Sequence, residues 1–134
     1  MKLRYLAGIG VLAAVFVLGG CQSKDDETFD GTYVGDGVDS QSSSNRKEFT
    51  LRISGGSPNV SGTYQIKAIL VDTSGGVTGT LTGSDLSLTL TPAAGVNDCP
   101  YRITGTWAGD RITGSYAAFN CFVRSDGTIS LKKK

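Results

Sequence analysis

The sequence predicts an all-β fold, an eight-stranded antiparallel up-and-down β-barrel. Apolar and polar residues alternate with a period of two in almost every segment after residue 28, which is typical of strands with one buried face. Glycine is frequent, with 19 residues in 134, and proline is rare, with three. That composition, together with dense Thr and Ser, favours strands joined by tight turns.

Four strands are expected in the first half of the chain. Each has apolar residues on one face and polar residues on the other. The predicted ranges, with the inward residues that define them, are 28–35 (Phe29, Tyr33), 46–54 (Phe49, Leu51, Ile53), 59–71 (Val60, Tyr64, Ile66, Ala68) and 77–82 (Leu81).

Four more strands are expected in the second half. The alternation is clearest where three leucines face one side and Ser or Thr the other. The predicted ranges are 85–91 (Leu86, Leu88, Leu90), 100–108 (Tyr101, Ile103, Trp107), 111–124 (Ile112, Tyr116) and 128–132.

A short motif, glycine two positions before a large residue, recurs five times. The two residues share a face of a strand, so the motif predicts the small–large alternation that fills a tapering barrel. The alternative is that these glycines are ordinary kinks in an open sandwich. The five copies are Gly31-Thr32-Tyr33, Gly62-Thr63-Tyr64, Gly79-Thr80-Leu81, Gly105-Thr106-Trp107 and Gly114-Ser115-Tyr116.

The connections divide into two groups. The second, fourth and sixth, 55–58, 83–84 and 109–110, have tight-turn composition and are expected at one end with both chain termini. The first, third and fifth, 36–45, 72–76 and 92–99, are generally longer and are expected at the opposite end. Loops on a rigid scaffold often carry recognition, so this end is the candidate interaction surface, with tolerated surface variation as the alternative.

The N-terminal segment has the architecture of an export signal. A basic start with Lys2 and Arg4 precedes a 14-residue apolar run from Tyr5 to Leu18, too short to span a bilayer as a helix. We expect a cleaved helical signal peptide at 1–20, a polar tether at 21–28 and a barrel domain at 29–134. An uncleaved anchor, or ordinary cleavage that leaves a free thiol, is the alternative.

Leu18-Gly19-Gly20-Cys21 resembles the lipobox of bacterial lipoproteins, although Gly19 stands where Ala or Ser is usual. The resemblance implies cleavage before Cys21, diacylation of its sulfur and acylation of its new amino group. Two or three acyl chains hold a protein durably at a membrane. Gln22 after the cysteine implies the outer membrane, facing the periplasm or the cell surface. The Gly-Thr-Tyr and Gly-Thr-Trp repeats also resemble those of small avidin-type and lipocalin-type barrels.

Export to an oxidising compartment predicts a disulfide between Cys99 and Cys121, with redox-active free thiols as the alternative. A two-residue turn at 109–110 pairs Ala108 with Arg111, so Cys99 would face the residue before Cys121. One β-bulge in the seventh strand would correct this offset and turn Phe119 inward.

Composition also excludes several chemistries. The chain has no histidine, which removes Ser-His and Cys-His nucleophilic schemes and the commonest transition-metal ligand. Ser44 and Lys47 have the Ser-x-x-Lys spacing of enzymes with a serine nucleophile. They lie in a Ser-rich loop, however, and not at the start of a helix, where that mechanism needs them. The acidic residues between Asp25 and Asp39 fit no EF-hand loop, so no metal and no cofactor is expected. Loss of Lys2 and Arg4 changes the formal charge from +1 to −1, which argues against nucleic acid as a partner.

The sequence therefore favours a lipid-anchored, non-enzymatic binding or structural module of the bacterial envelope. Its expected partners are the membrane, through lipid on Cys21, and an envelope protein. One alternative is a carrier of a small apolar ligand; another is an inhibitor or adhesin that acts through the loops. The candidate ligand-lining residues are Tyr33, Tyr64, Tyr101, Trp107 and Tyr116.

Overall fold

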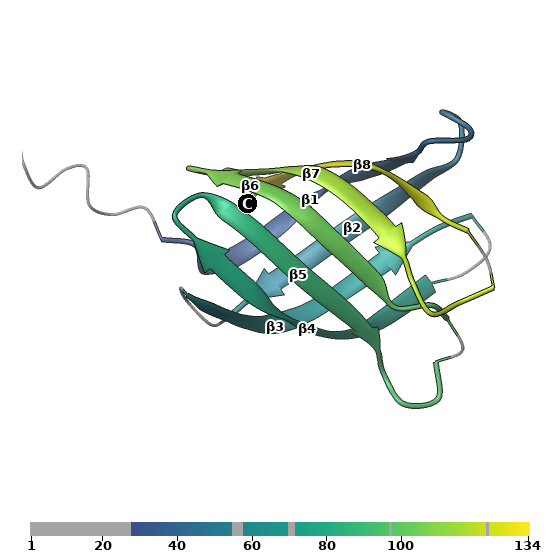
Figure 1. Ribbon diagram of the computed structural model, residues 1–134, viewed down its shortest axis with the longest axis horizontal. Helices are drawn as coiled ribbons and strands as arrows, with labels where there is room; N and C mark the ends of the chain where they lie inside the picture. Colours follow the sequence, from purple (N-terminus) through teal and green to yellow (C-terminus); the bar gives the residue numbers. More distant parts are fainter. Residues whose placement is uncertain (1–27, 55–57, 70–71, 97, 123) are drawn as a thin grey trace, which may run out of the picture.

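The fold is a closed eight-stranded antiparallel barrel in which every strand pairs with its neighbours in sequence and the last pairs with the first (Figure 1). The structure is a computed structural model that describes residues 28–54, 58–69, 72–96, 98–122 and 124–134. Closure confirms the predicted up-and-down barrel and excludes the open sandwich, because pairing of β1 with β8 leaves no free sheet edge.

The strands are of similar length, between eight and eleven residues. They are β1 (Gly31–Asp39), β2 (Arg46–Ile53), β3 (Asn59–Lys67), β4 (Asp72–Thr82), β5 (Asp85–Pro92), β6 (Tyr101–Ala108), β7 (Arg111–Ala118) and β8 (Asp126–Lys133).

Two strands extend through segments that were predicted as loops. β1 runs to Asp39 rather than to residue 35, and β4 begins at Asp72 rather than at residue 77. Both segments are rich in Gly, Asp and Ser, which locally favour turns. In the barrel, backbone pairing with a strand on each side outweighs this local preference, because β1 pairs with β2 and β8 along the same stretch.

Two other strands are shorter than predicted. β3 ends at Lys67 rather than at residue 71, and β7 ends at Ala118 rather than at residue 124. Asn120 has a φ of 50°, in the left-handed region that ends strands, so the chain leaves the sheet before Cys121. The prediction of a long seventh strand that carries Cys121 was therefore wrong.

The inward faces form a single core. Each strand contributes alternate residues to it, as the period-two pattern predicts. The largest fully buried side chains are Tyr33, Tyr116, Phe49, Leu51, Leu88, Leu90, Ile103, Ile112, Leu131 and Val77.

The two ends of the barrel differ, and we name them by their connections. The turn end carries the β2–β3 connection, the two-residue turns Gly83-Ser84 and Gly109-Asp110, and the described chain ends at Thr28 and Lys134 (Figure 1). The loop end carries the β1–β2, β3–β4, β5–β6 and β7–β8 connections. This arrangement confirms the predicted grouping of the connections and adds the β7–β8 connection to the loop end.

In four of the five copies of the recurring motif, close backbone contact requires the glycine; at Gly31 the neighbour is the Lys133 side chain. A Cβ on Gly114 would lie 2.1 Å from the carbonyl oxygen of Thr104 and 2.6 Å from the Cα of Gly105, its partner on β6. No side chain fits such a gap. The motif therefore marks where neighbouring strands coil tightly, which is the geometry that barrel closure needs.

Candidate functional site

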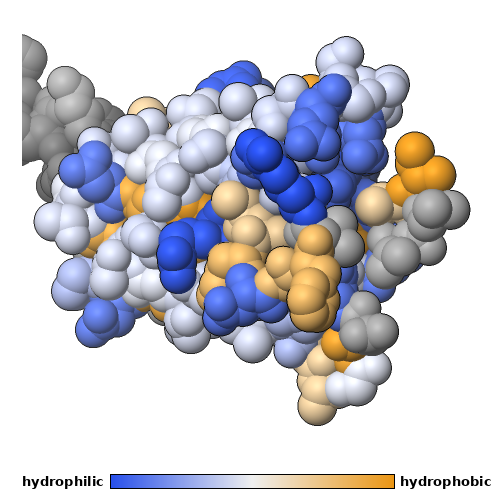
Figure 2. Space-filling model, turned by 45° about the vertical axis from the view of Figure 1, so that its right-hand side comes forward, coloured by the Kyte–Doolittle hydropathy of each residue, from blue (hydrophilic) through white to orange (hydrophobic). Residues whose placement is uncertain are grey.

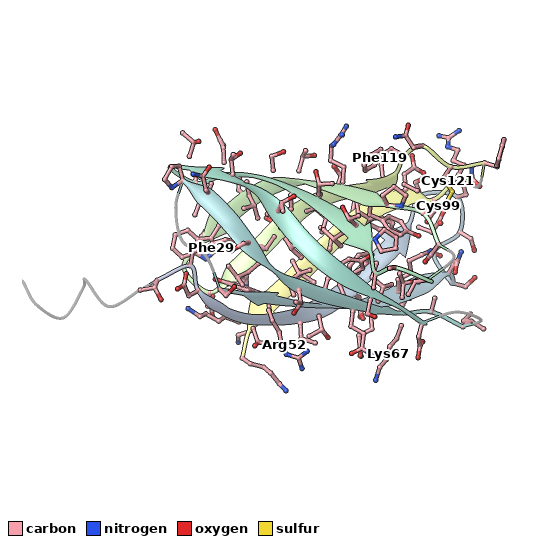
Figure 3. The ribbon with its side chains drawn as sticks, turned by 90° about the horizontal axis from the view of Figure 1, so that it is seen from below. Phe29, Arg52, Lys67, Cys99, Phe119 and Cys121 are labelled. Carbon is pink, nitrogen blue, oxygen red and sulfur yellow. A yellow bond between two sulfur atoms is a disulfide. The ribbon has the colours of Figure 1, made fainter. Side chains whose placement is uncertain are left out.

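The predicted set of aromatic residues divides between the two ends of the barrel. Tyr33 and Trp107 lie at the turn end, where the ring of Phe29 packs against both, with centroid distances of 5.7 and 5.4 Å. Figure 3 shows Phe29 within this end and the two disulfide cysteines at the other. The structure therefore does not place the five predicted residues around one site.

Hydrogen bonds hold the turn end shut. The Tyr33 hydroxyl donates to the backbone oxygen of Phe29 over 2.9 Å, and Lys133 Nζ donates to the backbone oxygen of Thr28 over 2.6 Å. The backbone nitrogen of Lys134 donates to the oxygen of Thr32. These contacts seat Phe29 as a plug that is only 5% exposed.

Aromatic rings also fill the middle of the barrel. The centroid of the Tyr116 ring lies 5.3 Å from that of Phe49 and 6.1 Å from that of Tyr101. A Cβ on Gly37 would come within 2.8 Å of both the Phe49 and the Tyr116 ring. At this level the side chains occupy the space that an apolar ligand would need.

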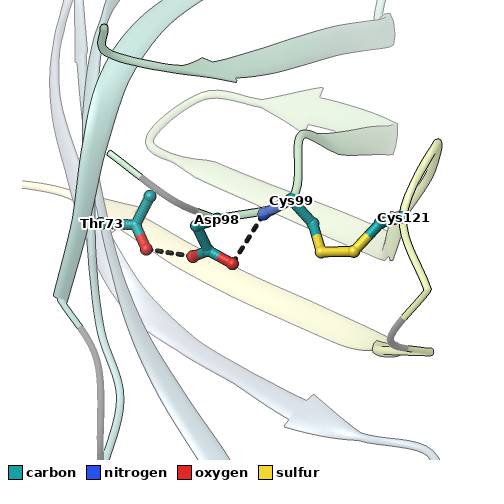
Figure 4. The surroundings of a disulfide bond; sticks show 4 residues. All are labelled: Thr73, Asp98, Cys99 and Cys121. Atoms are coloured by element: carbon teal, nitrogen blue, oxygen red, sulfur yellow. Dashed lines mark hydrogen bonds between the residues drawn. A yellow bond between two sulfur atoms is a disulfide. The ribbon is translucent and has the colours of Figure 1, made fainter. Parts of the chain in front are cut away.

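Polar groups gather beneath the loop end. Asp39, Thr73 and Ser125 are the polar side chains that are buried among the described residues. Thr73 Oγ1 donates to a carboxylate oxygen of Asp98, whose other oxygen accepts from the backbone nitrogen of Cys99 over 2.7 Å (Figure 4). The barrel therefore changes from an apolar to a polar interior toward this end.

Several hydroxyl groups at this end are buried. Among the described residues, Tyr64 Oη has no hydrogen-bond partner, whereas Ser125 lies close enough to the hydroxyls of Tyr101 and Tyr116 to offset part of the rise that burial causes in their pKa, without full hydrogen-bond geometry. Tyr64 is 3% exposed and Tyr116 is 1% exposed. Burial of an unpaired hydroxyl costs about 1–3 kcal/mol, so the Tyr64 oxygen is poised to accept or donate a hydrogen bond.

The ionisation of the tyrosines reflects the same surroundings. Burial raises the pKa of both Tyr64 and Tyr116 to about 12, and the nearby carboxylates of Asp98 and Asp39, respectively, add to the rise. Burial also raises the pKa of Tyr101, again with Asp98 and Asp39 nearby.

We name as the mouth cluster the six residues that lie together here: Asp39, Tyr64, Asp98, Tyr101, Tyr116 and Ser125.

A disulfide links the two loops beside the mouth cluster. In the structure Cys99, in the β5–β6 connection, is bonded to Cys121, in the β7–β8 connection, with their Cα atoms 5.6 Å apart (Figure 4). The bond joins loop to loop, not loop to strand as predicted.

The predicted β-bulge is not present in β7. Pairing with β6 runs unbroken to Tyr101 and Ala118. The expectation that Phe119 turns inward was also wrong: its ring lies 4.6 Å from the guanidinium carbon of Arg102, which is on the exposed face of β6. The left-handed backbone of Asn120 takes the place of the bulge in bringing Cys121 to Cys99.

Sequence reasoning missed four residues of the loop end. Asp39, Thr73 and Asp98 fell in predicted loops, and Ser125 fell between two predicted strands. A signal for Asp39 was present, since it continues the inward parity of Tyr33, Gly35 and Gly37 along β1. Ser125 has no such signal, because it precedes β8.

Two hollows mark the outer wall. One, of about 380 Å³, borders Asp39, Tyr116, Asp126 and Gly127, where β1, β7 and β8 meet the loop end. The other, of about 670 Å³, lies over β3, β4 and β5, where Gly75 and Gly76 leave the wall without side chains. The first borders Asp39 and Tyr116 of the mouth cluster, and the second borders Tyr64.

Exposed apolar side chains occur at the loop end. Ile69, in the β3–β4 connection, is 78% exposed, and Phe122, in the β7–β8 connection, is fully exposed. Figure 2 shows most of the barrel wall in pale or blue tones, with larger orange areas toward the right-hand, loop-bearing end. Contiguous apolar patches mark surfaces that meet a partner, whereas single exposed apolar side chains are common on folded domains.

The fold and its two ends define the class: a small closed β-barrel with a plugged turn end and a polar, loop-bearing mouth. Comparison with protein-family models, curated proteins and solved structures gave no match. Cys21 and the expected signal peptide lie outside the described residues. Within the described part of the chain, no helix is long and apolar enough to cross a membrane, and no group of three or more His, Cys, Asp or Glu side chains is placed to hold a metal ion.

Proposed function

We propose that this protein is a lipid-anchored, non-enzymatic binding module of the bacterial cell envelope. The single observation that carries the proposal is that the two ends of the barrel differ. Thr28, the first described residue, lies at the turn end, whereas the longer loops with exposed Ile69 and Phe122 lie at the opposite end. A lipid on Cys21 would hold the turn end toward the membrane and present the loop end away from it.

The proposed location in the oxidising cell envelope is supported by the two cysteines of the domain. The disulfide between Cys99 and Cys121 favours an oxidising compartment. The segment Leu18-Gly19-Gly20-Cys21 supplies the matching export and acylation signal. Lys132, Lys133 and Lys134 close the chain at the turn end, where they would face anionic headgroups.

Recognition by the loops is favoured over transport of an apolar ligand inside the barrel. The middle of the interior is filled by the rings of Phe49, Tyr101 and Tyr116. The exposed apolar tips offer a surface for a protein partner instead, as an inhibitor or adhesin would use.

Metabolic labelling with an alkyne fatty acid tests the anchor. The full chain is expected to carry label and to fractionate with membranes, whereas Cys21→Ser is expected to lose both properties. A Cys99→Ser, Cys121→Ser double variant is the matched control, because it changes cysteines but leaves the acylation site. Label that survives Cys21→Ser would overturn the anchor.

Site-specific crosslinking tests the binding surface. A photoreactive residue at Phe122 is expected to capture a discrete envelope protein in living cells, and the same residue at Ser84, on the turn end, is expected to capture none. Equal capture at both positions would contradict recognition through the loop end.

A further inference from the structure

We propose that one side of the turn end docks on anionic lipid headgroups, so that the barrel lies tilted on the membrane and does not stand upright on its tether. This inference deepens the proposed function and rests on its lipid anchor. It names anionic lipid as a second contact with the membrane and assigns that contact to one wall of the barrel.

Exposed cations gather on this side of the turn end. Arg111 and Lys132 lie opposite each other on β7 and β8. The backbone nitrogen of Lys134 donates to the oxygen of Thr32, and Thr32 lies opposite Arg52 on β2. We name Arg52, Arg111, Lys132 and Lys134 the basic wall, and each of these side chains is exposed.

The basic wall lacks partners within the fold. None of its cations forms an ion pair with another residue that the structure describes. The ion pairs that are formed, of Arg46 with Asp36 and of Arg124 with Asp126, lie toward the loop end. The positive charges of the basic wall are therefore free to meet a partner.

The acidic residues of the turn end do not cancel this charge. Asp85 begins β5, which is separated from β8 by β6 and β7. Asp30 and Asp110 also lie at this end, and neither forms an ion pair with a described residue. With Lys133 counted beside the basic wall, cations remain in excess over these acids.

The positions of Arg111 and Lys132 carry a cost for folding. Like charges directly opposite each other on antiparallel strands repel and destabilise the pairing. Lys133, by contrast, serves the fold, because its Nζ donates to the backbone oxygen of Thr28 over 2.6 Å. An anionic surface would relieve the repulsion between Arg111 and Lys132 and would attract both.

The tether is short enough to bring the basic wall to a membrane. A chain spans at most about 3.6 Å per residue, so an acylated Cys21 would hold Thr28 within roughly 25 Å of the lipid surface. Thr28 is in turn held at β8 by Lys133. Electrostatic attraction acts over about 8–10 Å at physiological ionic strength, a distance that the tether allows the basic wall to reach.

The shape of the basic wall favours a lipid surface over a single small anion. Its cations lie on the outside of β2, β7 and β8 and just beyond the end of β8, with β1 between them. The outside of a closed barrel is convex, so one phosphate ion would reach only neighbouring cations. Lipid headgroups move laterally and can meet all of them together.

The test uses the full chain as the cell acylates it, reconstituted in vesicles, and the fluorescence of its single tryptophan. Trp107 lies at the turn end against Phe29, so energy transfer to a dansyl-labelled headgroup reports how closely this end approaches the membrane. We expect more efficient transfer in vesicles of phosphatidylcholine with phosphatidylglycerol than in phosphatidylcholine alone. Sodium chloride at about 1 M, which shortens the screening length to about 3 Å, should remove the difference.

Matched double variants locate the docking surface. At about fivefold for each cation near an anionic surface, Arg111→Gln with Lys132→Gln is expected to lower the ratio of docked to undocked chains about 25-fold. Lys67→Gln with Arg102→Gln removes the same charge nearer the loop end and is expected to leave the ratio unchanged. Figure 3 shows Arg52 and Lys67 projecting from the outside of the barrel, with Lys67 nearer the loop end.

The free energy of unfolding separates docking from folding. Because Arg111 and Lys132 repel each other, their joint replacement is expected to leave the free energy of unfolding in urea unchanged or higher, measured in neutral detergent micelles. A large loss of stability would show that the pair serves the fold, and would overturn its assignment to the membrane.

The inference is also overturned if transfer is equal in the two kinds of vesicle, if salt does not remove the difference, or if the two double variants behave alike. Release by inorganic phosphate at a much lower ionic strength than chloride would indicate a site for the free ion instead of lipid. A chain that enters neutral vesicles through its acyl chains but shows no preference for anionic lipid leaves the anchor intact. Fatty-acid label that survives Cys21→Ser removes the anchor itself, so the two failures are distinguishable.

Discussion

Gly114 and Gly105 face each other across β7 and β6, and their spacing shows what the Gly-x-large motif does. The large residue of each copy packs in or against the core, and in four of the five copies (Gly62, Gly79, Gly105 and Gly114) the glycine admits the backbone of the next strand. The two roles belong to different residues, so single substitutions separate them.

Gly114→Ala is expected to destabilise the barrel by at least about 2 kcal/mol, because the added Cβ would lie 2.1 Å from the Thr104 oxygen. The free energy of unfolding in urea measures the effect. Gly76→Ala is the control: no described atom lies within 4 Å of that Cβ, and alanine lowers the entropy of the unfolded chain. Equal losses at the two positions would contradict the close-contact explanation.

The buried tyrosines predict a loss of stability at alkaline pH. The pKa of Tyr64 and of Tyr116 is about 12 in the folded chain, against an ordinary value of 10.0. The folded state thus binds these protons more tightly, so its advantage is complete below pH 10 and declines as pH rises toward 12. Ultraviolet titration of phenolate should show late ionisation of these groups, and Tyr64→Phe should remove part of the pH dependence. Ionisation of all tyrosines near pH 10 with the fold intact would contradict their burial.

At the scale of the elements, the ends of the strands were harder to predict from the sequence than the strands themselves. Strand alternation allowed every strand to be placed from the sequence, yet four boundaries differ by four residues or more. Gly and Asp in β1, and Asp, Ser and Gly in β4, favour turns locally, and only pairing with neighbouring strands makes these segments extended. The end of β7 was missed for the opposite reason, because Asn120 leaves the sheet.

The disulfide is predicted to stabilise the loop end. It closes a loop of 22 residues, so its loss should lower the free energy of unfolding by roughly 3 kcal/mol in the chain-entropy model. The Cys99→Ser, Cys121→Ser variant should also show faster exchange of the amide at position 99, whose nitrogen donates to Asp98 in the parent, and unchanged exchange in the β6–β7 turn. A reductant should weaken the parent but not the double variant; sensitivity of both would point to another cause.

For the whole molecule, closure of the sheet is the central property. β8 pairs with β7 on one side and β1 on the other, and its Ile129 and Leu131 are buried in the core. None of the eight described strands is an edge, which removes the usual site of strand-to-strand aggregation.

Truncation of the chain after Ser125 is expected to abolish the barrel. It removes β8, leaves β1 and β7 as unpaired edges and opens the core to water. Circular dichroism and size-exclusion chromatography should report loss of cooperative unfolding and formation of oligomers. Deletion of Gln22 to Glu27 is the control, expected to leave unfolding unchanged; a folded monomer after loss of β8 would show that closure is dispensable.

The sequence by itself determined the class of fold, the face of each strand and the grouping of connections. These follow from local alternation and turn composition, which each segment carries on its own. Only the tertiary structure decided that Tyr33 and Trp107 belong to a plug, that Tyr64, Tyr101 and Tyr116 share a mouth with Asp39 and Asp98, and that a left-handed Asn120 brings Cys121 to Cys99. The reason is that barrel closure and strand coiling set the height of each inward residue, and this height depends on the register of all eight strands together.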